Sequence, residues 1–212
     1  MSEEMIIRHC SPTLAGLKTA NMFNCEYESE EELTQYLRNI NTRLSRKGVR
    51  AIPLSCADNR ALIYLFRPDD LEKDLSDERA VKILASAGYA ACGAGKEPGK
   101  RKDCCCNAGC KGVSSCLMHL VGRLKETRTG MGFPHEIGLF LGYPPEDVKG
   151  FIEGDTANCK CVGTWKVFGD EKSARRTFAK YRKCSEVYSR LYGQGRPLEQ
   201  LTVKSSEGSA RS

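Results

Sequence analysis

The sequence lacks any segment that would carry the chain into or across a membrane. No run approaches the roughly 20 apolar residues that span a bilayer. The first ten residues, MSEEMIIRHC, are acidic where a signal peptide is basic, and their apolar stretch is too short for a secretory core. We therefore expect a soluble, cytoplasmic protein with no membrane partner.

Several motifs of catalysis and ligand binding are also missing. The chain has no Cys-x-x-Cys and no His-x-x-x-His, two spacings typical of zinc ligands. It has no paired-acid motif, and no glycine-rich loop lies between a predicted strand and a helix, where a nucleotide phosphate would bind. These absences leave the function open.

The composition is that of a folded protein with one unusual segment. A chain of 212 residues that is 40% hydrophobic can bury a core, and we expect one domain over residues 1–203 with a disordered tail at 204–212. Residues 93–112, GAGKEPGKRKDCCCNAGCKG, are rich in glycine and basic residues and offer almost nothing to bury. We expect a flexible insertion there, because no core would offset its ordering entropy.

A conspicuous stretch is FPHEIGLFLGYPPEDVKGFI, at 133–152. Its apolar run 137–141 lies between Pro134 and Gly142, which predicts a short buried strand. Pro145 and the acidic residues after it predict that a helix follows immediately.

Capping signals predict several helices. Ser11 and Pro12 indicate the start of a short helix, and a capping box of Ser29 with Glu32 begins a longer one. Residues 69–88 have helical spacing, with a break expected near Ser76-Asp77. Two more helices are expected, around 117–124 and from Asp170 onward.

The β-type runs are shorter. Residues 49–56 and 61–66 flank a turn composition that predicts a hairpin, and Pro53 predicts that the first strand is an edge strand. Residues 159–168 are expected to form another strand. The predicted fold class is α+β (mixed α/β), with a small sheet of about four strands covered by five or six helices.

Twelve cysteines without an export signal indicate reduced thiols and metal ligation more than a disulfide framework. Five lie close together, enough for a four-coordinate zinc or iron ion, and two more at i, i+2 would share one face of a strand. A reactive or incidental thiol-rich loop and buried structural cysteines are the alternatives. The candidate ligands are Cys104, Cys105, Cys106, Cys110, Cys116, Cys159 and Cys161.

Cys10 and His135 form a candidate catalytic pair. Cys10 is expected at or just before a helix N-terminus, where the helix dipole favours a thiolate. An early cysteine and a much later histidine have the chain order of papain-like hydrolases. No flanking signature or orienting third residue accompanies them, so a helix-start cysteine and a structural histidine are the alternatives. We interpret His9 and His119 as structural.

The net charge of +6 is concentrated near the C-terminus. From Lys160 onward there are twelve Lys or Arg and five Asp or Glu. A solvated helix face is the favoured explanation, and binding of a nucleic acid or acidic protein by the basic helix 170–192 is the alternative.

Four segments make the chain resemble an uncharacterised bacterial family, domain of unknown function 3793, which is typical of anaerobes. They are HCSPTLAGLKTANMF at 9–23, LIYLFRPDDLEKDL at 62–75, the stretch at 133–152, and CKCVGTWKVFGDEKSARRTFAKYRKCSEVY at 159–188. The resemblance implies that these segments form one domain, and it implies no activity, cofactor or catalytic residue. The cysteine-rich tract at 104–110 departs from the family's usual pattern.

Three functional hypotheses follow. The first is a thiol-rich protein that binds zinc or iron or acts in metal or redox homeostasis. The second is a papain-like Cys-His hydrolase or acyltransferase, and the third is an interaction module that uses its basic C-terminal helix.

Overall fold

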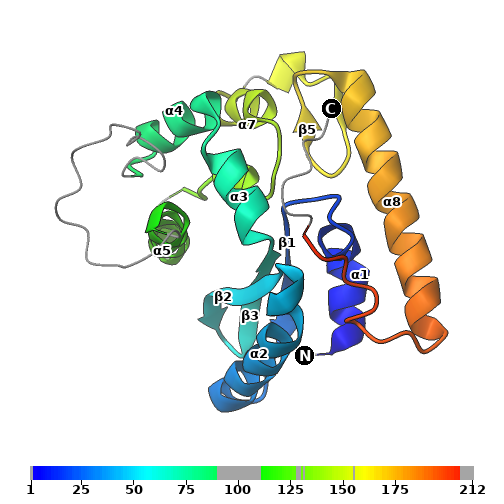
Figure 1. Cartoon of the computed structure of the whole chain (residues 1–212). Helices are drawn as coiled ribbons and strands as arrows, with labels where there is room; N and C mark the ends of the chain where they lie inside the picture. Colours follow the sequence, from blue (N-terminus) through cyan, green and yellow to red (C-terminus); the bar gives the residue numbers. More distant parts are fainter. Residues whose placement is uncertain (1, 90–110, 128–129, 131, 155, 206–212) are drawn as a thin grey trace, which may run out of the picture. The chain divides into compact units, whose positions relative to one another are not determined.

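The structure, a computed structural model, describes residues 2–89, 111–127, 130, 132–154 and 156–205. Helices with two small antiparallel sheets confirm the predicted α+β class (Figure 1). The chain divides into a first unit, Met1–Asp69 with Asp170–Ser212, and a second unit, Asp70–Gly169. The prediction of one domain stays a prediction. The expected insertion and tail lie almost wholly outside the described residues.

The first unit contains a three-stranded antiparallel sheet in the order β1-β3-β2. β2 (Arg50–Ala57) and β3 (Arg60–Phe66) form the predicted hairpin. Asp58 and Asn59 have φ values of 50° and 56°, as the two central residues of a type I′ turn require. β3 is central, so the prediction that the proline-containing β2 is an edge strand is confirmed.

The other edge strand corrects a prediction. α1 (Glu3–Leu14) begins eight residues before the expected start at Ser11, and residues from Ala20 onward form β1 (Ala20–Glu26) instead of continuing a helix. The proline rule for a first helical turn was misleading here, because Pro12 lies in the last turn of α1. Gly16, with φ of 69°, follows the helix end.

The two helices of this unit that were predicted from the N-cap residues Ser29 and Asp170 are confirmed. α2 (Glu30–Leu44) begins after Ser29, whose Oγ accepts from the Glu32 N–H at 3.1 Å, and the 3₁₀ turn η1 (Ser45–Lys47) follows it. α8 (Glu171–Gly193) begins after Asp170, which accepts from the Ser173 N–H, and it lies alongside α1 (Figure 1). Their apolar faces join the sheet in one core.

Arg67 is a buried cation in this core, with 1% of its surface exposed. Its guanidinium donates to the carbonyl oxygens of Thr13 and Leu14, at 2.7 and 2.8 Å, and to that of Val203 at 2.7 Å. It also donates to Ser205 Oγ at 3.0 Å. Helix C-terminal carbonyls carry partial negative charge, so Arg67 links the end of α1, β3 and the chain after α8.

Lys18 is a second buried cation of the first unit, and it gives a pH-dependent prediction. Burial lowers the pKa of Lys18 to about 8, and the neighbouring Cys10 opposes the shift. The unfolded chain keeps a lysine pKa of about 10.4, so between these values it binds more protons than the folded protein. The contribution of Lys18 to stability should therefore rise with pH across this window, by at most about 1.4 kcal/mol per unit.

Urea unfolding of the wild type and of Lys18→Met from pH 7.5 to 10.5 measures this contribution as the difference between the two curves. The buried Cys10 thiol, whose pKa is raised, lowers the stability of both proteins as pH rises and cancels in the difference. Lys18→Met should be the more stable protein below pH 8, because it has no amine to desolvate in the folded state, and its advantage should shrink toward pH 10.5. An advantage that does not change with pH would contradict the assignment.

The second unit is mainly helical. α3 and α4 are separated at Ser76-Asp77 as predicted, and the Asp77 carboxylate accepts from the Arg79 N–H at 2.8 Å. The elements of this unit are α3 (Pro68–Leu75), α4 (Glu78–Ser86), α5 (Lys111–Glu126), α6 (Ile137–Phe140), α7 (Pro145–Ile152), η3 (Thr156–Asn158), β4 (Cys161–Val162) and β5 (Lys166–Val167).

The predicted strand at 137–141 is wrong, because these residues form α6. A short apolar run fits a buried strand or a buried helix turn equally well. The deciding signal is the glycine after it. Gly142 has φ of 71°, its N–H donates to Leu139 O, and the Tyr143 N–H donates to Gly138 O. This is a Schellman helix end. The helix predicted from Pro145 is confirmed as α7.

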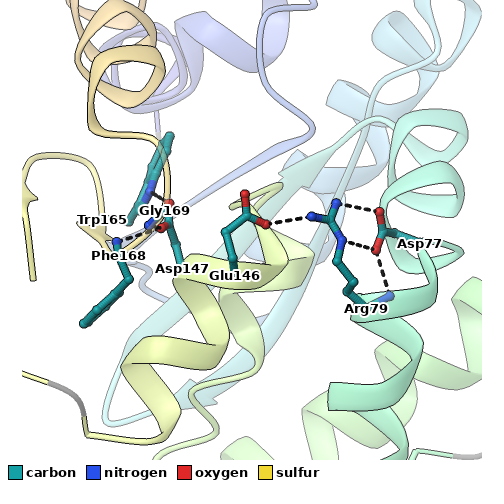
Figure 2. A network of polar contacts seen from close by, with 7 residues as sticks. All are labelled: Asp77, Arg79, Glu146, Asp147, Trp165, Phe168 and Gly169. Carbon is teal, nitrogen blue, oxygen red and sulfur yellow. Dashed lines mark hydrogen bonds and ion pairs between the residues drawn. The ribbon is translucent and has the colours of Figure 1, made fainter. Parts of the chain in front are cut away.

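The strand predicted at 159–168 is also wrong in extent. The residues form a small hairpin, in which β4 pairs with β5. The Asp147 side chain of α7 fastens this hairpin to α7 through hydrogen bonds (Figure 2). Asp147 is buried and accepts from Trp165 Nε1 at 2.6 Å and from the Phe168 and Gly169 N–H groups at 2.7 Å. These distant partners, and not a continuous ladder, hold the segment in place.

Candidate functional site

The face of α5 that carries Cys116, His119 and Arg123 contacts a small group of buried polar side chains in the second unit. The three residues recur at i, i+3 and i+7, which places them on one side of a helix. Cys116 is 1% exposed and is disulfide-bonded. The other six described cysteines are not in disulfide bonds.

This face of α5 contacts a buried carboxylate through Arg123. Glu136 is 2% exposed and forms an ion pair with Arg123, Nε to Oε1, at 2.9 Å. Tyr89 is buried beside it, and its hydroxyl donates to the same carboxylate oxygen at 3.1 Å. Burial and the adjacent carboxylate raise the pKa of Tyr89, so the phenol keeps its proton and remains a donor at neutral pH.

His119 is the unsatisfied member of this group. Its ring packs against that of Tyr89, with centroids 4.2 Å apart and planes at 55°. Its Nε2 is buried and has no hydrogen-bond partner among the described residues. Buried polar atoms are nearly always paired, so an orphan of this kind calls for a partner, which a ligand, a water, an ion or a residue outside the described ranges would supply.

Cys116 and His119 have the helical spacing of two ligands of one metal ion. Residues three apart on a helix are neighbours, and thiolate with imidazole is a donor set that suits zinc and iron. Our interpretation of His119 as structural overlooked this spacing, which is visible in the sequence directly after the cysteine tract. No group of three or more His, Cys, Asp or Glu side chains suited to a metal occurs in the described ranges.

The other predicted ligands are placed differently. Cys104, Cys105, Cys106 and Cys110 lie outside the described residues. Cys159 and Cys161 are half-buried, and the Cys159 thiol donates to the Cys161 carbonyl oxygen at 3.5 Å. Cys159 precedes β4, so the pair does not share one face of a strand as we expected.

Cys10 does not lie at a helix start, which corrects the expectation on which its activation depended. It is inside α1, completely buried, and burial raises the pKa of its thiol well above the ordinary value. His135 is exposed in the second unit, edge-on to the ring of Phe151 at 4.9 Å. The pairing of Cys10 with His135 stays a prediction. The Cys10 thiol, however, is neither at a helix N-terminus, where the helix dipole would favour a thiolate, nor accessible to solvent.

Comparison with known proteins supports the resemblance seen in the sequence. Residues 6–202 match the family described as protein of unknown function (DUF3793). No curated protein and no solved structure matches the chain. No helix in the described part of the chain has the length and apolar character needed to cross a bilayer. Since the family match extends over almost the whole sequence, the protein belongs to the DUF3793 family.

Proposed function

We propose that the protein binds one soft metal ion, zinc or iron(II), through Cys116 of α5 and cysteines that precede α5 in the sequence, with His119 as a further ligand. The observation that carries this proposal is the buried, unpartnered Nε2 of His119, one helical turn from Cys116. Tract cysteines Cys104, Cys105, Cys106 and Cys110 are the remaining candidate donors. Cys159 and Cys161 are a secondary pair.

The surroundings of His119 support a ligand role. Its ring is held between α5, which carries it, and Tyr89, and Tyr89 is itself fixed by its hydrogen bond to Glu136. Such outer contacts orient metal-binding imidazoles. Arg123 balances the charge of Glu136, so this carboxylate is an orienting group and not a ligand.

Thiol ligation requires reduced cysteine. Reduction of the disulfide at Cys116 yields thiols, and each thiol that ligates the metal loses its proton. The proposal therefore places the protein in the cytoplasm, where thiols are kept reduced. Metal binding and disulfide formation would exclude each other at Cys116, which makes a role in metal or redox homeostasis the natural extension.

Metal analysis tests the proposal. Protein purified anaerobically with a reductant should contain about one equivalent of zinc or iron, as a single four-coordinate site requires. His119→Gln should lower the zinc affinity at least about 10-fold, on the scale known for loss of metal-site groups. Chelation should lower the melting temperature of the wild type, because binding energy stabilises the folded chain.

The matched control is His9→Gln. His9 lies in the first unit, where its ring stacks on Phe23 at 5.4 Å, and its removal should leave metal content unchanged. Fewer than about half an equivalent of metal in the wild type, with His119→Gln indistinguishable from it in zinc affinity, would contradict the proposal.

We infer a second function from α8, the binding of an anionic macromolecule. This helix carries seven Lys or Arg and two Glu, and most of these cations are exposed. Retention on a sulfated polysaccharide matrix that weakens with salt would support it. Retention insensitive to salt would count against it. The hydrolase hypothesis receives no such support, because Cys10 is buried.

A further inference from the structure

Four of the seven basic residues of α8 form a straight stripe on the side opposite its packing face. Ala174 and Cys184, both buried, mark the face that packs in the first unit. At 100° per residue, four cations lie within about 40° of one another on the far side, and they extend along about 27 Å of helix at 1.5 Å per residue. These cations, the basic stripe, are Lys172, Arg176, Lys183 and Arg190, all exposed.

Little on this face opposes the positive charge. Glu186 lies 4.0 Å from Lys183, in an exposed pair that water and salt weaken. Glu171 pairs with Arg175 at the side of the stripe. With seven Lys or Arg and two Glu, α8 has a net charge close to that of the entire chain, which is +6.

The uncharged residues of the exposed face are small. Ala179 is exposed beside the stripe and Ser173 and Ser189 are exposed at its flanks. Val187, next to Arg176 on the helix surface, is half-buried, and no large hydrophobic residue of α8 is among the exposed ones of the described chain. Protein partners require buried aromatic or aliphatic anchors, and interfacial membrane helices require an exposed apolar face. Phosphate contacts require only Lys, Arg and small polar groups.

We propose that the basic stripe binds the phosphate backbone of a nucleic acid without reading its sequence. This inference rests on the anion-binding function proposed for α8 and specifies its partner. A uniformly charged polymer matches a linear row of cations, and each phosphate neutralised releases condensed counterions. The contact supplies affinity and position, and no base-reading side chain is assigned.

Fluorescence anisotropy with a labelled 20-nucleotide RNA and a labelled 20-bp DNA tests the proposal. For four phosphate contacts we expect a slope of log K against log salt of about −3 to −4, and a Kd in the range of roughly 1–100 μM near physiological salt. The variant K172Q/R176Q/K183Q/R190Q should bind roughly 100-fold more weakly at low salt and should lose most of the slope.

The control variant R8Q/R38Q/R46Q/R50Q removes the same charge from exposed positions of the first unit outside α8. It should keep most of the affinity. Equal weakening in the control would overturn the assignment to the stripe. Folding of both variants is checked by circular dichroism. If a quadruple variant fails to fold, single substitutions at Arg176 and Lys183 replace it, and each should weaken binding a few-fold.

Two competitors separate this inference from the broader function. Polyglutamate and phosphatidylserine vesicles should each compete far less well than RNA. If either binds through the stripe as tightly as RNA, anion binding stands and the nucleic-acid partner is overturned. If none of the four polyanions binds, both proposals are overturned.

Discussion

Arg67→Ala is expected to destabilise the protein by about 4 kcal/mol, the sum of a cavity in the core and several buried acceptors left without donors. The wild-type guanidinium donates to Thr13, Leu14 and Val203 carbonyl oxygens and to the Ser205 hydroxyl. Alanine supplies none of these donors, and water has no room to replace them all in a site that is 1% exposed. Urea unfolding measures the loss.

Two companion variants separate charge from geometry. Arg67→Lys keeps the positive charge but presents a point charge in place of a planar fork, so it should lose roughly half as much stability as alanine. Arg46→Ala, at an exposed position, should stay within about 0.5 kcal/mol of wild type. Limited proteolysis should cut near Val203 faster in Arg67→Ala. A loss below about 1 kcal/mol would refute the anchoring role.

Asp147→Ala is expected to destabilise the second unit by about 3 kcal/mol, because three N–H groups lose their acceptor. Trp165, the sole tryptophan, reports the change by its fluorescence, because it donates to Asp147 and stacks on Tyr143 with ring centroids 4.9 Å apart. Its emission should shift to longer wavelength as the indole becomes hydrated. Asp147→Asn, which keeps one acceptor oxygen, should have an intermediate effect.

Glu146→Gln is the matched control in the adjacent position. Its carboxylate pairs with Arg79 at 3.1 Å across an exposed contact (Figure 2), and exposed pairs contribute at most about 1 kcal/mol. We expect an unchanged Trp165 spectrum and a small loss of stability. If Glu146→Gln and Asp147→Ala behave alike, the network in Figure 2 does not hold the hairpin as described.

Local signals explain which elements were predictable. Ser29 and Asp170 cap their helices by contacts within three residues, and the turn of the β2-β3 hairpin needs two residues with positive φ. Such interactions lie inside a short window of sequence. By contrast, the apolar run at 137–141 satisfies strand and helix equally, and only the helix end at Gly142 distinguishes them. The close packing of α6 on α7, where a Cβ on Gly138 would lie 2.8 Å from Val148 Cγ2, is a tertiary contact that the run itself does not indicate.

The groups that matter most for stability and for the candidate site depend on distant partners. Arg67 and Val203 are 136 residues apart, and Tyr89 and Glu136 are 47 apart. No local pattern indicates that such residues meet. Cys116 and His119 are the exception, because their helical spacing is readable in the sequence, whereas the burial of His119 Nε2 is not.

Cobalt(II) titration of the reduced protein under anaerobic conditions tests metal binding by Cys116 and His119 most directly. We predict thiolate-to-cobalt charge transfer bands and tetrahedral d–d absorption that saturate near about one equivalent, as in four-coordinate zinc sites. Both should weaken in Cys116→Ser, and the d–d bands should shift in His119→Gln. Saturating spectra that are identical in wild type, Cys116→Ser and His119→Gln, or no bands in the wild type, would contradict the account.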